Sequence, residues 1–142
     1  MKGMQTRLNI YSDGGARGNP GPAAAAYLIV AENGAVQKAE ARYLGKRTNN
    51  QAEYEALIAA LEAASAMGAQ EVVCYLDSEL VCRHLTGEYK VKNSELQKLW
   101  TKTCGLTRRF KQVSFVNVPR TNSFIQEADR LLNEELDKAT GK

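Results

Sequence analysis

Hydrophobic and polar residues alternate in some segments of the chain and recur every three or four positions in others. Residues 6–13 alternate, with Leu8 and Ile10 on one side, which is the period of a β-strand. Residues 50–67 carry an apolar stripe at helical spacing, and Gly68 follows where a helix commonly ends. The two periods predict a chain that mixes strands with helices.

Two further apolar runs, residues 24–32 and 35–44, are joined by Asn33-Gly34. Asn-Gly is the strongest short signal for a β-hairpin, because a type I′ turn needs a positive φ at both residues. We therefore predict an antiparallel pair of strands here. Similar patterns predict strands at 71–76 and 112–118, and helices at 78–85, 94–106 and 124–139.

The predicted order of elements is β-β-β-α-β-α-α-β-α. An early hairpin followed by alternating helices and strands indicates an α/β fold, a mixed sheet with helices on its faces. The right-handed crossover rule makes the strand at 71–76 parallel to its partner. A length of 142 residues fits one domain, 1–142, and we expect residues 1–5 and 140–142 to be frayed.

Charge and cysteine content narrow the class of protein only slightly. The net charge of +3 is a mild excess, informative about nucleic acid only if the acids gather in one place. Three cysteines and a single histidine, His84, make a zinc site improbable and indicate free thiols in a reducing compartment. The longest apolar stretch, 23–31, is too short to span a membrane. We expect a cytoplasmic protein.

Four acids stand out, although each has a structural explanation. Asp13 precedes two glycines, as turn residues do, and Glu53 lies three residues after Asn50, as in a capping box. Asp77 follows a strand and can cap the next helix. Asp129 lies at the rim of an apolar helix face with no cation three or four residues away, so a structural reason is hardest to find for it.

These acids come from the first strand, the first long helix, the next strand and the last helix. If they converge, four carboxylates raise each other's pKa values and need a strong counter-charge. Oxygen ligands without soft donors select Mg²⁺ or Mn²⁺ over zinc. Two such ions ~4 Å apart stabilise the attacking and leaving oxygens of phosphodiester cleavage. The pattern therefore indicates a metal-dependent nuclease.

The segments around the acids resemble four motifs of the ribonuclease H family, type 1. They are YSDGGARGNPGP at 11–22, TNNQAEYEAL at 48–57, LDSELV at 76–81, and VPR at 118–120 with EADRL at 127–131. The similarity runs from about residue 6 to the last helix. It implies a ribonuclease H-like fold: a five-stranded mixed sheet, three strands antiparallel and two parallel, with helices on both faces.

The resemblance implies hydrolysis of the RNA strand of an RNA–DNA hybrid with two Mg²⁺ ions, for which Mn²⁺ can substitute. The products would carry 5′-phosphate and 3′-hydroxyl ends. The catalytic and metal-binding residues would be Asp13, Glu53, Asp77 and Asp129. Asp13 would bridge both ions, Asp77 and Asp129 would each hold one, and Glu53 would ligate a metal and contact a 2′-hydroxyl.

The resemblance also implies hybrid recognition through 2′-hydroxyls and groove shape, with Thr48 at a DNA phosphate and Lys46 or Arg47 adding charge. For the asparagines, helix capping or a loop role stays open. The substrate-binding candidates are Gly14, Gly15, Asn19, Lys46, Thr48, Asn49, Asn50, Gln51, Glu79 and Asn93. We expect a monomer, and no protein partner is implied.

The chain departs from the family pattern in two places. The loop before the last helix lacks the histidine that many members carry, and Arg120 and Asn122 are the auxiliary candidates for its role. His84 lies in another element, where we expect it to pack locally. Residues 87–93 are too short for the long basic protrusion of some members, although Lys90 and Lys92 can contact a backbone. We therefore expect modest hybrid affinity with a steep salt dependence.

Two other functions stay open at this point. One is a non-catalytic module that binds RNA or a hybrid on the same fold, since a fold does not fix a function. The other is a different nuclease of the broader superfamily, such as a DNA-strand transferase or resolvase. A module that only binds has no use for four converging acids, which repel phosphate unless a metal is present.

Overall fold

A computed structural model describes residues 7–141 of the chain. The observed order of elements is the predicted one. The elements are β1 (Arg7–Ala16), β2 (Gly21–Ala31), β3 (Val36–Arg47), α1 (Asn49–Ala66), β4 (Glu71–Leu76), α2 (Glu79–Leu85), α3 (Ser94–Thr107), β5 (Gln112–Asn117) and α4 (Ser123–Thr140).

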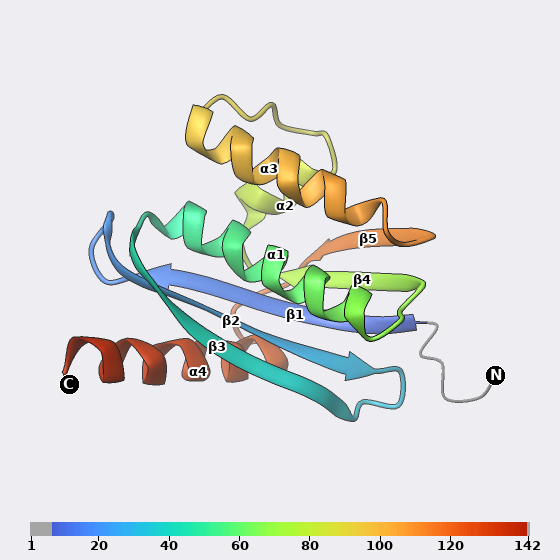
Figure 1. Ribbon diagram of the computed structural model, residues 1–142, viewed down its shortest axis with the longest axis horizontal. Helices are drawn as coiled ribbons and strands as arrows, with labels where there is room; N and C mark the ends of the chain where they lie inside the picture. Colours follow the sequence, from blue (N-terminus) through green and yellow to red (C-terminus); the bar gives the residue numbers. More distant parts are fainter. Residues whose placement is uncertain (1–6, 142) are drawn as a thin grey trace.

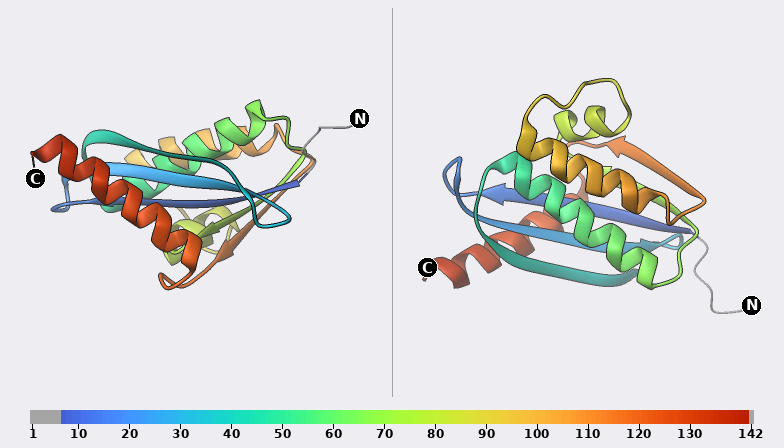
Figure 2. Two further views of the ribbon diagram at one scale, coloured as in Figure 1. Left: turned by 90° about the horizontal axis from the view of Figure 1, so that it is seen from below. Right: turned by 45° about the horizontal axis from the view of Figure 1, so that its top comes forward.

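The five strands form one mixed sheet in the order β3-β2-β1-β4-β5. β1 pairs antiparallel with β2, and β2 with β3, whereas β4 is parallel to both β1 and β5. Figures 1 and 2 show α1 and α3 on one face of the sheet and α4 on the other. The predicted fold class is confirmed, including the parallel crossover into β4.

Each face of the sheet has its own core, and the two faces use helices of different character. α1 buries residues around most of its circumference, because it lies between the sheet and α3. α4 buries only one stripe, formed by Ile125, Ala128, Leu132 and Leu136, and packs against β1, β2 and β3. This one-sided packing leaves Asp129 at the edge of the buried stripe, as predicted.

β1 is longer than the sequence pattern suggests. It continues through Gly14 and Gly15 to Ala16, and these residues stay paired with Ala25, Ala24 and Ala23 of β2. Asp13 is therefore inside a strand, and the interpretation of Asp13 as a turn residue is wrong. By strand alternation its side chain shares a face of the sheet with that of Tyr11, the face against which α4 packs, and it lines a cavity there.

The β2–β3 hairpin forms at the predicted place, but its turn is not type I′. Gly34 has φ +90°, whereas no non-glycine residue among 7–141 has a positive φ, so Asn33 does not adopt the conformation that type I′ requires. Gly34 N donates to Ala31 O (2.9 Å) and Ala35 N donates to Asn33 Oδ1 (2.9 Å). These bonds define a tight turn closed by one left-handed glycine.

The last helix extends one residue further toward the carboxyl end than the sequence pattern predicts. Thr140 belongs to α4 and donates to Leu136 O, and Gly141 caps the helix with φ 77°. Residues 1–5 and 142, also expected to be frayed, lie outside the described residues. No helix within residues 7–141 has both the length and the hydrophobicity of a membrane span.

Candidate active site

Three carboxylates meet at the carboxyl ends of β1 and β4. Asp13 lies near the end of β1 and Asp77 directly follows β4; the two strands are parallel, so their ends share one edge of the sheet. Glu53 comes from the first turns of α1. One oxygen from each of the three lies within 4.8 Å of the other two.

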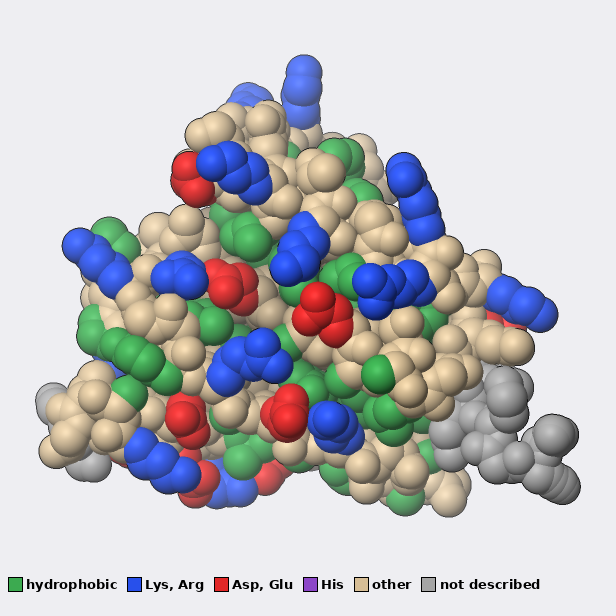
Figure 3. All heavy atoms as spheres, viewed as in Figure 1, with side chains coloured by type: hydrophobic (Ala, Val, Ile, Leu, Met, Phe, Trp, Pro, Cys, Tyr) green, Lys and Arg blue, Asp and Glu red, His purple; other side chains and the backbone are tan. Residues whose placement is uncertain are grey.

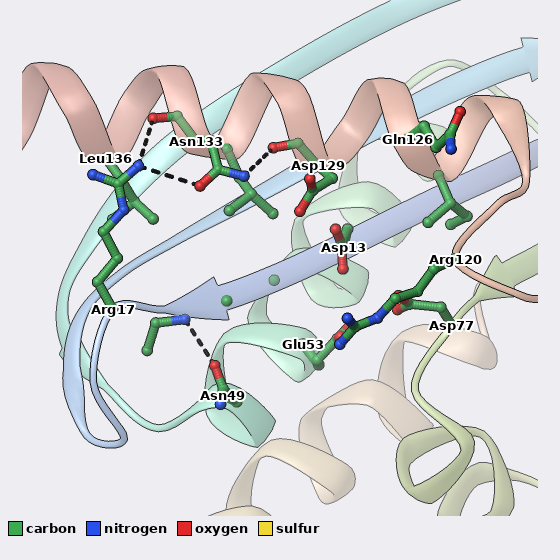
Figure 4. Close-up of a pocket in the computed structure, with 15 residues that line it drawn as sticks. Asp13, Arg17, Asn49, Glu53, Asp77, Arg120, Gln126, Asp129, Asn133 and Leu136 are labelled. Atoms are coloured by element: carbon green, nitrogen blue, oxygen red, sulfur yellow. Dashed lines mark hydrogen bonds and ion pairs between the residues drawn. The ribbon is translucent and has the colours of Figure 1, made fainter.

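Asp129 lies apart from this group of three but lines the same cavity, which encloses about 480 Å³. It is exposed on α4, and Figure 4 shows its carboxylate pointing toward Asp13 from the opposite wall. The structure thus brings all four predicted acids to one cavity, with three packed closely and the fourth facing them.

The crowding of these acids perturbs their ionisation. Burial, followed by the charges of Asp77 and Asp129, raises the pKa of Asp13 to about 8. Burial, followed by Asp13 and Asp77, raises the pKa of Glu53 well above its ordinary value. Arg120 Nε lies 3.7 Å from Asp77 Oδ2, but its side chain is 92% exposed, so water screens most of its charge.

The donor set fits a divalent cation. Glu53 Oε1 and Asp77 Oδ1 are buried and have no hydrogen-bond partner within residues 7–141. An ionised carboxylate can only accept, so two such buried oxygens in one close group of acids need a proton or a cation beside them. Hard oxygen donors favour Mg²⁺ or Mn²⁺.

Gly14 allows Glu53 to approach Asp13. A Cβ at Gly14 would lie 2.2 Å from Ala52 O and 2.6 Å from Glu53 N, so a side chain there cannot be accommodated beside the backbone of α1. Gly15 is less constrained, since its Cβ would lie 3.7 Å from Leu132 Cδ1. Packing therefore accounts for Gly14, and both glycines line the cavity.

Glu53 takes no part in capping α1. Gln51 N donates to Thr48 Oγ1 (3.1 Å) and Thr48 N donates to Gln51 Oε1 (2.9 Å), so the capping box joins Thr48 and Gln51. The alternative box of Asn50 and Glu53 is wrong. Thr48 and Gln51 thus have a structural role in addition to their predicted contacts with the hybrid. The Glu53 carboxylate is not used in capping and can therefore line the cavity. Asn50 lies partly exposed in the first turn of α1.

Asn19 and Asn49 connect the β1–β2 loop to the start of α1. Asn49 N donates to Asn19 Oδ1 (3.0 Å) and Ala16 N donates to Asn49 Oδ1 (2.8 Å). With both side-chain oxygens used within the protein, the amide nitrogens are left to donate to a ligand. Asn49 lines the main cavity with Ala16.

The remaining substrate candidates lie outside the main cavity. Lys46, at the end of β3, lines a second hollow with Arg47, Gln51 and Lys98. Glu79 is exposed in the first turn of α2. It accepts from Arg83 (2.8 Å).

Three of the other predicted residues have structural roles: Asn93 and Asn122 cap helices, and His84 packs in the core. Asn93 caps α3, and Asn122 caps α4 by accepting from Phe124 N and Ile125 N. Arg120 reaches the cavity. His84 is buried, with Nδ1 2.8 Å from Tyr54 Oη, and burial lowers its pKa, so its local packing is confirmed. Cys74, Cys82 and Cys104 are free, with two of them buried.

Sequence reasoning missed Arg17, Gln126 and Asn133, which also line the cavity. Arg17 donates to Asn133 across a separation of 116 residues. No local sequence pattern could predict this contact, because it depends on how α4 packs near the end of β1 in the folded protein.

Comparisons with known proteins point to one family. Residues 11–134 match the reverse transcriptase-like family. Ribonuclease HI of Halobacterium salinarum is 41% identical over 133 residues, which cover 94% of this chain and 66% of that protein. The N-terminal RNase H domain of Rv2228c from Mycobacterium tuberculosis, solved as a fusion with maltose-binding protein, superposes with a TM-score of 0.91 at 36% identity, covering 96% and 97% of the two chains. LC11-RNase H1, solved in complex with an RNA/DNA hybrid, superposes with a TM-score of 0.88 at 40% identity. The match covers 94% of this chain and 99% of that one.

The mixed sheet and the acids at its edge define a domain of ribonuclease H-like fold. The chain belongs to the ribonuclease H family, type 1. It spans 66% of the length of the Halobacterium enzyme and 36% of the mycobacterial bifunctional protein Rv2228c.

Proposed function

We propose that this chain is an endonuclease that hydrolyses the RNA strand of RNA–DNA hybrids with two divalent ions, leaving 5′-phosphate and 3′-hydroxyl ends. The observation that carries the proposal is the close group of Asp13, Glu53 and Asp77, with two buried oxygens that lack partners within residues 7–141. The hybrid bound to LC11-RNase H1, a protein 40% identical to this chain, supports the substrate class.

Asp13, Glu53, Asp77 and Asp129 would hold the ions, Mg²⁺ or in its place Mn²⁺. When bound, such ions lower the pKa of water and neutralise charge on a transferring phosphoryl group. The raised pKa values of Asp13 and Glu53 mean that both must lose a proton before they ligate, so binding releases protons. Arg120 lines the cavity beside Asp77, where its guanidinium would contact a phosphate of the cut strand.

The amide nitrogens of Asn19 and Asn49, with Asn50 and Gln51, would contact the minor groove beside the cut. Thr48 and Lys46, at the end of β3 and start of α1, would bind the DNA strand. Glu79 and Asn93, on the α2 and α3 side of the cavity, would contact the hybrid further along. The domain would act as a monomer in the cytoplasm.

The test is cleavage of a short end-labelled RNA–DNA hybrid with Mg²⁺, beside single-stranded RNA, duplex DNA and an Asp13→Asn protein. We expect cutting of the hybrid RNA alone, lost with chelator and with Asp13→Asn. The ends are identified by ligation and by phosphatase treatment, which separate 5′-phosphate from 3′-phosphate products. A folded protein that binds the hybrid but cuts nothing with Mg²⁺ or Mn²⁺ would support the binding module instead.

A further inference from the structure

The cavity has a second polar end, away from the three close acids. Arg17, directly after β1, extends along α4, and its Nη2 donates to Asn133 O (3.3 Å) and Asn133 Oδ1 (3.2 Å). The same nitrogen pairs with Asp137 Oδ1 at 2.8 Å. Figure 4 shows Arg17 at the opposite end of the cavity from Arg120. Arg17 is half-buried, so its contacts are partly shielded from water.

Arg17 is the polar connection between α4 and the sheet. Apart from capping by Asn122 and Gly141 at the two ends of the helix, every hydrogen bond and ion pair that joins α4 to another part of residues 7–141 involves Arg17. The other contacts of α4 with the sheet are apolar, through residues such as Leu132 and Leu136. Apolar packing is non-directional, so it fixes the distance of a helix from a sheet better than its position along it.

The connection lies beside the acids. Arg17 follows Asp13 by four residues along the chain, and Asn133 follows Asp129 by four residues, one turn along α4. Asn133 also donates from Nδ2 to Asp129 O (2.9 Å), so the side chain that receives Arg17 is bonded to the backbone of the acid. A displacement of Asn133 is therefore passed directly to Asp129.

Once Asp13 is ionised, as a metal ligand must be, Asp13 and Asp129 carry like charges across the cavity and repel each other. We propose that Arg17, through Asn133 and Asp137, is a positioning residue that holds Asp129 opposite Asp13 and thereby sets the affinity of the centre for divalent metal. This inference rests on the proposed function, because it takes Asp129 as a metal ligand.

The test compares Arg17→Ala with the wild type in two assays. One is hybrid cleavage as a function of Mg²⁺ concentration, and the other is Mn²⁺ binding by calorimetry without substrate. We expect Arg17→Ala to raise the half-saturating Mg²⁺ concentration about 10-fold, the lower end of what loss of a ligand's supporting partner costs, and to weaken Mn²⁺ binding similarly. The rate at saturating Mg²⁺ should change far less. A merely structural role would lower that rate without moving the metal dependence.

Two further variants sharpen the test. Arg17→Lys can keep the ion pair with Asp137 but loses the guanidinium contacts with Asn133, so it should fall between Arg17→Ala and the wild type. Arg130→Ala is the matched control: Arg130, on α4, is likewise an arginine that forms ion pairs, but with Glu127 and Glu134 of its own helix and outside the cavity. It should leave the metal dependence unchanged.

If Arg17→Ala does not fold, Asn133→Ala provides the test instead, because it keeps the ion pair between Arg17 and Asp137. It should shift the metal dependence in the same direction as Arg17→Ala, but by a smaller factor. Folded Arg17→Ala or Asn133→Ala protein with the wild-type Mg²⁺ requirement and Mn²⁺ affinity would overturn the proposal. Failure of the proposed function would show earlier, as a wild-type protein that neither cuts the hybrid nor binds Mn²⁺.

Discussion

Asp13 is well placed to bind a metal, but its burial near other acids should destabilise the metal-free protein when its carboxyl group is ionised. The folded protein keeps the Asp13 proton up to a pKa of about 8, whereas the unfolded chain loses it at about pH 4. The folded state therefore binds more protons between these values. The free energy of unfolding should fall as pH rises through that window. Asp13→Asn removes the titration, so with chelator present it should be more stable than wild type at about pH 8, by roughly 1–3 kcal/mol.

Urea denaturation at about pH 5 and about pH 8 measures the difference in free energy of unfolding between Asp13→Asn and wild type. This difference should be smaller at about pH 5 than at about pH 8. The same variant should lose all cleavage. Glu62→Gln is the control, since Glu62 is an exposed carboxylate of α1 away from the cavity. An Asp13→Asn protein less stable than wild type at both pH values would contradict the assignment of Asp13 as a buried acid that lacks a counter-charge.

The raised pKa values of Asp13 and Glu53 also predict how the metal requirement changes with pH. Protons compete with metal for both carboxylates below the raised pKa values, so affinity should rise as pH rises toward about 8. The half-saturating Mg²⁺ concentration for cleavage should fall by about tenfold per pH unit for each proton displaced, and the contribution of Asp13 should level off above about pH 8. Mg²⁺ titrations of cleavage at several pH values measure it. A Mg²⁺ requirement that is flat from about pH 6 to 8 would speak against metal binding by these two acids.

The sequence alone located the four acids, because each follows a local pattern at the end or edge of an element. It could not show whether the alternative structural roles, a turn for Asp13 and a capping box for Glu53, are the real ones. Asp13 is no turn residue because its glycines stay paired in β1, and Glu53 caps nothing because Thr48 and Gln51 form the capping box. The contact of Arg17 with Asn133 was invisible because only the tertiary fold brings the two residues together.

Among the elements, the contact of β1 with α1 decides whether Glu53 reaches Asp13. Gly14→Ala would place a Cβ 2.2 Å from Ala52 O, a backbone atom that cannot move without displacing α1. We expect a loss of roughly 1–3 kcal/mol in stability. Cleavage should fall by more than the folded fraction explains, because Glu53 moves with the helix. Thermal denaturation and cleavage at saturating Mg²⁺ measure the two effects.

Gly15→Ala is the matched control, since the same change one residue later meets only Leu132 at 3.7 Å, an ordinary contact. It should be close to wild type in stability. Equal effects of the two substitutions would show that the close approach of β1 to α1 is not what requires glycine at position 14.

Element boundaries were harder to predict than element types. The order of strands and helices followed from periodicity, but pairing with a neighbour extended β1 by three residues beyond Asp13, and β3 runs to Arg47. The hairpin was found from Asn33-Gly34, while its turn type was not, because one left-handed glycine suffices there. Pairing and turn geometry depend on partner strands that a local pattern does not describe.

At the scale of the whole molecule, four of the 16 acids gather at the cavity, while the other acids and most lysines and arginines are spread over the rest of the molecule. Figure 3 shows basic side chains distributed across the face formed by α1, α3 and β3. Lys46, Lys90 and Lys92 are exposed and form no ion pair within residues 7–141, so their charges are available to phosphates. Binding that depends on such contacts releases counterions and weakens with salt.

We therefore expect the logarithm of the hybrid binding constant to fall with the logarithm of salt concentration, with a slope of roughly −3 if these three lysines each neutralise a phosphate. Fluorescence anisotropy with the Asp13→Asn protein measures binding without cutting. Lys46→Ala, Lys90→Ala and Lys92→Ala should each reduce the slope by about 0.9. Lys111→Ala is the control, because Lys111 precedes β5 at the edge of the sheet away from the acids. A binding constant that hardly changes between low and moderate salt would mean that the hybrid is held by uncharged contacts in the groove, and that the basic surface has no part in binding.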